Sequence, residues 1–193
     1  SGIAFTSGKN VILLDGHGAP VWEIEMKDHL AGPATIADID ADGKPERTVI
    51  TIDGTLHCLD ATGRQLWELA FDTPSGGFKH IVAADLLDSP GLELLIGFDD
   101  GWLNCVSAKG ELLWHFFGDK GRVGGIAAAD ADADGAPEIV YGTDNGHVYC
   151  LTADGLVEWR YDELAPYGRS GPNIADANGD GKPEVYVTRS NVG

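Results

Sequence analysis

Short apolar stretches alternate with turn residues along the whole chain, and no stretch keeps a helical period over ten residues. In one well-marked segment the stretches are rich in β-branched and aromatic residues, which is typical of strands. Asp53 and Gly54 between two of them indicate a tight hairpin, because both residues tolerate positive φ angles. The pattern predicts four strands, at residues 34–38, 47–52, 55–60 and 65–71.

The same pattern returns about every 46 residues. Its clearest marker is a tryptophan four residues after a glycine, and these tryptophans are spaced 45, 47 and 45 residues apart at Trp22, Trp67, Trp114 and Trp159. We divide the single domain, residues 1–193, into repeat units at about 1–30, 31–77, 78–122 and 123–167, with a partial unit at 168–193. The prediction is an all-β fold, a β-propeller of about four 46-residue blades, each a four-stranded antiparallel sheet. A β-sandwich would not explain why whole units recur.

The stretches at the two ends of the chain both match the second strand of a unit. They are IAFTS, residues 3–7, and EVYVTRS, residues 184–190. We therefore expect one blade to be completed either by both termini or by a neighbouring chain in a homo-oligomer.

Three of the connections between first and second strands share one acidic pattern. They read DIDADGKPE from Asp38, DADADGAPE from Asp130 and DANGDGKPE from Asp176. When such a loop curls, the side chains at positions 1, 3, 5 and 9 and the carbonyl at position 7 can face one centre, and this number of hard oxygen ligands suits Ca²⁺ better than Mg²⁺. Without a cation the carboxylates repel one another. Asp and Gly are also common in unliganded turns, but three loops in one register favour the metal interpretation.

A fourth loop, Asp85 to Glu93, departs from the pattern. Leu87 and Ser89 stand at positions 3 and 5, and Pro90 replaces the glycine. We expect no ion there.

The acidic loops resemble those of FG-GAP or VCBS-type, integrin-like propeller repeats, over residues 36–184. In that family each calcium loop joins the first and second strands of a blade. The resemblance implies about three Ca²⁺ ions, with side-chain ligands Asp38, Asp40, Asp42 and Glu46; Asp130, Asp132, Asp134 and Glu138; and Asp176, Asn178, Asp180 and Glu184; the backbone ligands would be Lys44, Ala136 and Lys182.

The segments around the tryptophans, such as LHCLDATGRQLWEL from Leu56 to Leu69, resemble the repeats of PQQ-type quinoprotein propellers. This second resemblance implies that each tryptophan docks between neighbouring blades. It does not by itself imply a quinone cofactor.

Charge narrows the possible partners. The chain has 31 acidic and 13 basic residues and a net charge of -18, so nucleic acid and anionic membrane surfaces would be repelled. No apolar run is long enough for membrane insertion.

Three cysteines, Cys58, Cys105 and Cys150, occupy equivalent apolar positions and are expected to be small buried hydrophobes.

Together these features favour a non-enzymatic binding or scaffold module in which calcium is mainly structural, with a protein or carbohydrate ligand. No catalytic residue stands out, since the six histidines show no metal-ligand spacing. Because cytosolic calcium is scarce, we expect an extracellular or periplasmic location. Two alternatives stay open: a propeller domain of an extracellular enzyme, of the polysaccharide lyase or PQQ-dependent dehydrogenase type, or a truncated or engineered piece of a longer protein.

Overall fold

The computed structural model describes residues 3–72, 80–162 and 171–187, and the regular structure in these ranges consists of β-strands. The first sheet contains β1 (Ile3–Ser7), β2 (Asn10–Leu14) and β3 (Pro20–Glu25), and the second contains β4 (Thr35–Ala37), β5 (Glu46–Ile50), β6 (Thr55–Leu59) and β7 (Gln65–Ala70). The third contains β8 (His80–Ala84), β9 (Glu93–Gly97), β10 (Trp102–Val106) and β11 (Leu112–Phe117). The fourth contains β12 (Val123–Ala129), β13 (Glu138–Thr143), β14 (Val148–Thr152) and β15 (Val157–Tyr161), and the fifth contains β16 (Asn173–Ala175) and β17 (Glu184–Tyr186). None of these elements is a helix that could cross a membrane.

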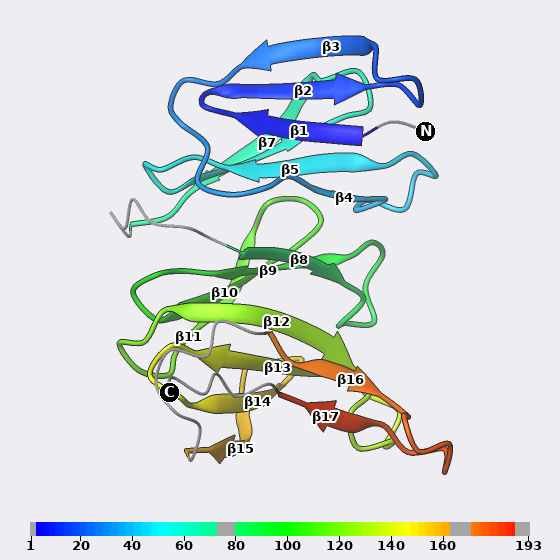
Figure 1. Cartoon of the computed structure of the whole chain (residues 1–193), viewed down its shortest axis with the longest axis vertical. Helices are drawn as coiled ribbons and strands as arrows, with labels where there is room; N and C mark the ends of the chain where they lie inside the picture. Colours follow the sequence, from blue (N-terminus) through cyan, green and yellow to red (C-terminus); the bar gives the residue numbers. More distant parts are fainter. Residues whose placement is uncertain (1–2, 73–79, 163–170, 188–193) are drawn as a thin grey trace.

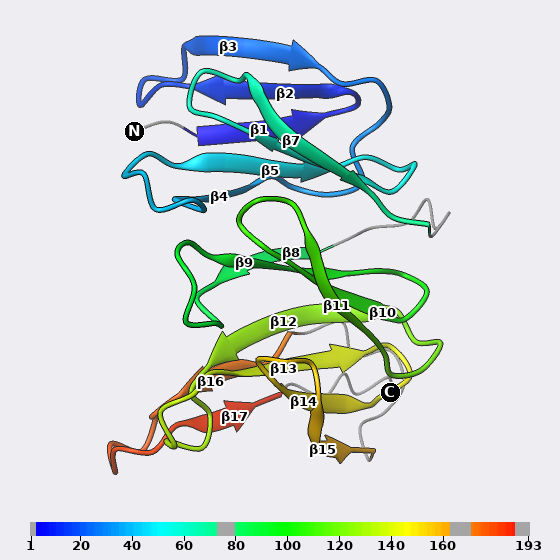
Figure 2. The ribbon, with the colours of Figure 1, turned by 180° about the vertical axis from the view of Figure 1, so that it is seen from behind.

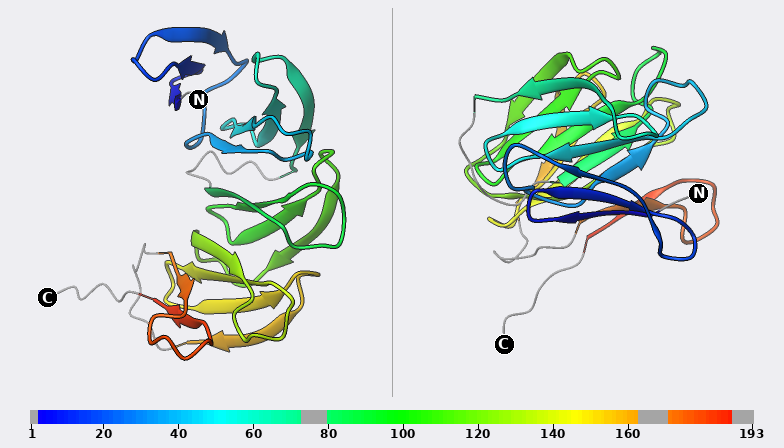
Figure 3. Two further views of the ribbon diagram at one scale, coloured as in Figure 1. Left: turned by 90° about the vertical axis from the view of Figure 1, so that its right-hand side faces the viewer. Right: turned by 90° about the horizontal axis from the view of Figure 1, so that it is seen from above.

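Within every sheet, strands that follow one another in sequence pair antiparallel, which confirms the predicted all-β fold of repeated antiparallel sheets. The sheets succeed one another in chain order along the long axis (Figure 1) and follow a curved path (Figure 3, left). Figure 2 shows the fourth strands β7 and β11 in front of their sheets. The successive first strands β4, β8, β12 and β16 contact one another, as expected of strands that line the axis of a propeller.

The first sheet, with β1, and the last sheet, with β17, lie at opposite ends of this arrangement (Figure 1). In the described part of the chain, β16 and β17 form a sheet of their own and do not pair with β1. The structure therefore contains no blade built from both termini in these residues.

The core lies between the sheets. Strand β9 is buried along its whole length because alternate side chains serve two interfaces: Leu94 and Ile96 pack toward the second sheet, whereas Leu95 packs toward the fourth. This explains why residues 94–96 of β9 read as a continuous apolar run. Cys58, Cys105 and Cys150 are free and buried in these layers, as predicted.

Three tryptophans connect neighbouring sheets. The indole Nε1 atoms of Trp22, Trp67 and Trp114 donate hydrogen bonds to the carbonyl oxygens of Ala61, Ala108 and Ala153 in the next sheet, at 3.1, 3.0 and 2.9 Å. Each ring lies over a glycine of the same turn, Gly63, Gly110 or Gly155, all with positive φ. The docking that the quinoprotein resemblance implies is therefore present for these three tryptophans, whereas Trp159 is 40% exposed. It explains the glycines at positions 63, 110 and 155, because each lies under the tryptophan of the preceding sheet.

Candidate metal centres

The three acidic loops lie at one edge of the sheets, between β4 and β5, β12 and β13, and β16 and β17, on the right-hand side of Figure 1. The aspartate at position 1 curls each loop, since it accepts a hydrogen bond from the glycine N–H at position 6. The three equivalent bonds are Gly43 to Asp38, Gly135 to Asp130 and Gly181 to Asp176, at 3.0, 3.0 and 2.9 Å. One side chain therefore folds the loop around its own oxygens.

Two positions of each loop take the left-handed backbone conformation. The glycine at position 6 has φ of 86°, 96° and 86° in the three loops, as its place in the pattern predicts. Position 4 was not recognised from the sequence. There Ala41 and Ala133 have φ of 59° and 65°, a region in which alanine is strained. Gly179, at the same position of the third loop with φ of 78°, is the sequence signal for this conformation.

The glutamate at position 9 anchors each loop to the sheet. Glu46 and Glu138 are each 3% exposed and accept hydrogen bonds from the backbone N–H at position 2, of Ile39 at 2.8 Å and Ala131 at 2.7 Å. Burial raises the pKa of both carboxyl groups above the ordinary value, and the neighbouring aspartates add to this rise. Their ionised forms are therefore disfavoured unless a positive charge is near.

Each loop gathers three carboxylates whose oxygens lie within 4.8 Å of one another and could hold an ion. The groups are Asp38, Asp40 and Asp42; Asp130, Asp132 and Glu138; and Asp176, Asp180 and Glu184. Two predicted carboxylate ligands, Glu46 and Asp134, lie outside these groups. Asn178 instead donates to Glu184 at 2.7 Å and to Asp180 at 3.3 Å. The roles predicted for the carbonyls of Lys44, Ala136 and Lys182 stay predictions.

One atom of the first loop indicates that a cation fits. Oδ1 of Asp38 is buried and has no hydrogen-bond partner, although Oδ2 of the same side chain accepts from Gly43. A buried carboxylate oxygen without a partner is costly. A divalent cation held with Asp40 and Asp42 would satisfy this atom and remove the mutual repulsion of the three carboxylates.

In the fourth loop, hydrogen bonds within the protein satisfy the closing glutamate. Glu93 is 1% exposed and accepts three hydrogen bonds, from the N–H groups of Leu86 and Leu87 at 3.0 and 3.2 Å and from the Ser89 hydroxyl at 3.0 Å. Ser89 therefore supports the closing glutamate at a position where the other loops carry a carboxylate. The absence of an ion from this loop stays a prediction.

A separate polar cluster lies at the opposite ends of the strands, in the fourth sheet. His147 stands between two carboxylates, with Nε2 3.6 Å from Asp119 and Nδ1 3.0 Å from Asp162. The Tyr149 hydroxyl also donates to Asp119, at 3.2 Å. No spacing in the sequence indicated this cluster, because its members come from different strands and turns.

Family comparisons agree with this architecture. Residues 6–76 match the family described as lambda-carrageenase beta-propeller domain, and residues 130–187 match the family described as FG-GAP-like repeat. Residues 130–187 are therefore similar to an FG-GAP-like repeat, in a fold of repeated antiparallel sheets consistent with a β-propeller. The second match contains two of the three acidic loops of this propeller, those that begin at Asp130 and Asp176. Curated protein sequences give no match.

Three solved structures have a similar fold. BamB from Moraxella catarrhalis is 19% identical with a TM-score of 0.67, and the match covers 90% of this chain and 49% of that one. BBS1N in complex with ARL6DN, in a crystal soaked with lead, is 14% identical with a TM-score of 0.65, and the match covers 90% of this chain and 57% of that one. The same complex soaked with mercury is 17% identical with a TM-score of 0.64, and the match covers 98% of this chain and 62% of that one. The propeller described here thus spans between 49% and 62% of the length of these chains.

Proposed function

We propose that this chain is a calcium-binding β-propeller in which the ions are mainly structural, and that it serves as a non-enzymatic binding or scaffold module. The observation that carries the proposal is the unpartnered, buried Oδ1 of Asp38 within a group of three carboxylates. Two further loops with the same hydrogen bonds and the same residue types support it.

Calcium would be held by the three carboxylate groups, with the remaining predicted ligands closing around each ion. Three ions would change the net charge from -18 to -12, since 3 × 2 = 6. Each loop joins the first and second strands of a sheet, so a bound ion would fix that connection. Because calcium would bind the folded loop better than the unfolded chain, each site at about 100 times its Kd would add about 2.7 kcal/mol to the free energy of unfolding.

The proposed location is extracellular or periplasmic, where calcium concentrations reach the range that such loops need. The acidic surface makes a protein or carbohydrate a better partner than nucleic acid or an anionic membrane. We also propose that the chain associates with further copies of itself as a homo-oligomer.

Thermal melting tests the calcium role. We expect the melting temperature to rise by roughly 5–10 °C for each site that fills between EDTA and millimolar Ca²⁺, since 1 kcal/mol corresponds to about 2–4 °C in a chain of this size. Mg²⁺ at the same concentration is the control and should give a smaller rise. A melting temperature that does not change with calcium would overturn the proposal.

A second candidate function is that of a propeller domain in an extracellular polysaccharide-degrading enzyme. The match of residues 6–76 to a lambda-carrageenase beta-propeller domain favours it. His147, between Asp119 and Asp162, is the residue to test. Cleavage of carrageenan by the chain, lost in His147→Ala, would support this alternative, whereas a spectral change on adding PQQ with calcium would support the dehydrogenase type.

A further inference from the structure

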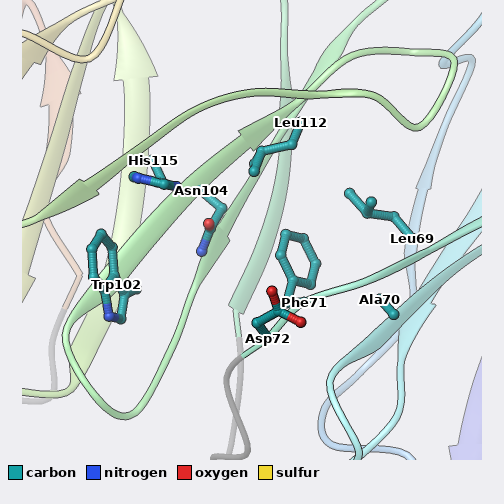
Figure 4. A pocket seen from close by; sticks show the side chains of 8 residues that line it. All are labelled: Leu69, Ala70, Phe71, Asp72, Trp102, Asn104, Leu112 and His115. Atoms are coloured by element: carbon teal, nitrogen blue, oxygen red, sulfur yellow. The ribbon is translucent and has the colours of Figure 1, made fainter.

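A cleft of about 440 Å³ opens between the second and third sheets (Figure 4). Its walls come from the end of β7, from β10 and from β11, and the lining side chains on which its chemistry depends are Leu69, Phe71, Asp72, Trp102, Asn104 and His115. Trp102 follows the hairpin between β9 and β10, whereas the acidic loop of the third sheet joins β8 and β9 at the other end of the strands. The cleft is therefore separate from the proposed calcium sites.

The cleft exists because a small residue replaces a large one. Asn104 precedes Cys105 in β10 just as Tyr149 precedes Cys150 in β14, and both side chains face the preceding sheet. Between the third and fourth sheets, the Tyr149 ring fills this place, 5.7 Å from the Phe116 ring and stacked 5.1 Å from the Tyr141 ring. Between the second and third sheets, asparagine leaves the corresponding volume open.

The amide of Asn104 faces this open volume, and no described residue pairs with it. Asn104 is 6% exposed, and within the described ranges its side chain makes no hydrogen bond. Its counterpart in β6, His57, has Nδ1 3.0 Å from Oε1 of Gln65. Leu112 takes the place of Gln65 in the third sheet and offers no such group. The two donors and one acceptor of this amide, which no described residue pairs with, are therefore available to a polar ligand in the cleft.

Figure 4 shows the Asn104 amide between the Trp102 and Phe71 rings. The Trp102 ring is held in place by His115 and Phe117, each with a ring centroid 5.0 Å away. The site therefore combines apolar ring faces with one central amide, and the exposed Asp72 carboxylate stands at its margin. A few polar groups in a mainly apolar, preformed cleft are typical of small-molecule sites.

We propose that this cleft binds a neutral sugar residue. A pyranose ring has an apolar C–H face for Trp102 and Phe71, and its hydroxyls both donate and accept, which matches the Asn104 amide and the Asp72 carboxylate. Among the described residues no lysine or arginine lines the cleft, and Asp72 together with the net charge of -18 would repel an anionic ligand. A quaternary ammonium ion would stack on the rings but would leave the amide unpaired.

The experiment is a titration of the full chain, in calcium-replete buffer, with the methyl glycosides of β-glucose, β-galactose and α-mannose and with cellobiose and lactose. Tryptophan fluorescence and saturation-transfer NMR are the two readouts. We expect saturable binding of at least one of these sugars with a Kd on the order of 1 mM. No binding of any of them up to about 20 mM, or saturable binding of choline alone, would overturn the proposal.

Two variants locate the site. Asn104→Tyr fills the cleft with the residue that the chain itself uses at position 149, and Asn104→Leu keeps nearly the same volume without the hydrogen bonds. Both should weaken binding at least about tenfold without lowering the melting temperature, because neither removes a hydrogen bond made within the described chain. His57→Asn, at the equivalent position of the second sheet, should leave sugar binding unchanged. Unchanged binding in either folded Asn104 variant would place the sugar elsewhere and refute the assignment.

Discussion

The contact between Gly110 and Trp67 offers a sharp test of how the sheets are joined. Gly110 has φ of 83° and lies under the Trp67 indole of the preceding sheet, and a Cβ added at Gly110 would lie 2.6 Å from Trp67 Cε3. Gly18 is the equivalent turn residue of the first sheet, with φ of 81° and nothing within 4 Å of the added atom. Alanine at Gly18 therefore reports the backbone strain alone, and alanine at Gly110 reports strain together with the displaced ring.

The expected magnitudes follow from these two terms. Alanine in the left-handed region costs about 1–2 kcal/mol at either glycine. At Gly110 the indole must also move, and this overpacking adds about 1–3 kcal/mol. The movement also breaks the 3.0 Å hydrogen bond that Trp67 donates to the Ala108 carbonyl in the parent chain, at a cost of about 1 kcal/mol. We expect Gly110→Ala to be less stable than Gly18→Ala by about 2–4 kcal/mol, or roughly 10 °C in melting temperature.

Urea unfolding followed by far-UV circular dichroism measures both variants against the parent chain, in the same calcium concentration. Equal midpoints for Gly110→Ala and Gly18→Ala would show that the tryptophan contact adds nothing to stability. That result would refute the interpretation of the glycine and tryptophan spacing as a joint between sheets.

Three further outcomes are expected. Asp132→Asn removes one carboxylate of the second acidic group and should weaken calcium binding there at least about tenfold, whereas Asp88→Asn in the fourth loop should leave calcium-dependent melting unchanged. Burial raises the pKa of each of the three cysteine thiols to about 12, so none of them should react with a disulfide reagent at pH 8 until the chain unfolds. A prompt reaction would contradict the burial of these thiols in the core. Hydrogen bonds, the largest from the Thr62 hydroxyl, lower the pKa of the Asp60 carboxyl to about 2 from an ordinary 3.8. The stabilisation by the ionised Asp60 carboxylate is therefore fully present above pH 4 and is lost as the pH falls through about 2, so Asp60→Ala should lower stability by about 1 kcal/mol at pH 7 and by much less at pH 2.

The sequence predicts the strands well because both their period and their turns are local. Asp53 and Gly54 fix one hairpin, and Gly54 donates to the carbonyl of Thr51 at 3.0 Å. That bond also explains why β5 ends at Ile50 and not at residue 52 as predicted: the last two residues of the apolar stretch already belong to the turn.

The candidate sites are less accessible from the sequence because they depend on contacts between distant residues. The side-chain types of the acidic loops can be predicted, but which carboxylates gather cannot: Glu46 and Glu138 occupy the same position and accept the same backbone hydrogen bond, yet only Glu138 belongs to its group. Asn104 reads as one polar residue in an apolar strand. Only the position of β7 against β10 shows that its amide faces an open cleft.

Calcium stoichiometry tests the central claim most directly. Isothermal titration of the EDTA-treated full chain with Ca²⁺, together with elemental analysis of the dialysed product, would count the ions bound per chain. The three acidic groups predict about three ions per chain. A chain that binds no calcium in millimolar solution, with an unchanged melting temperature, would contradict the account.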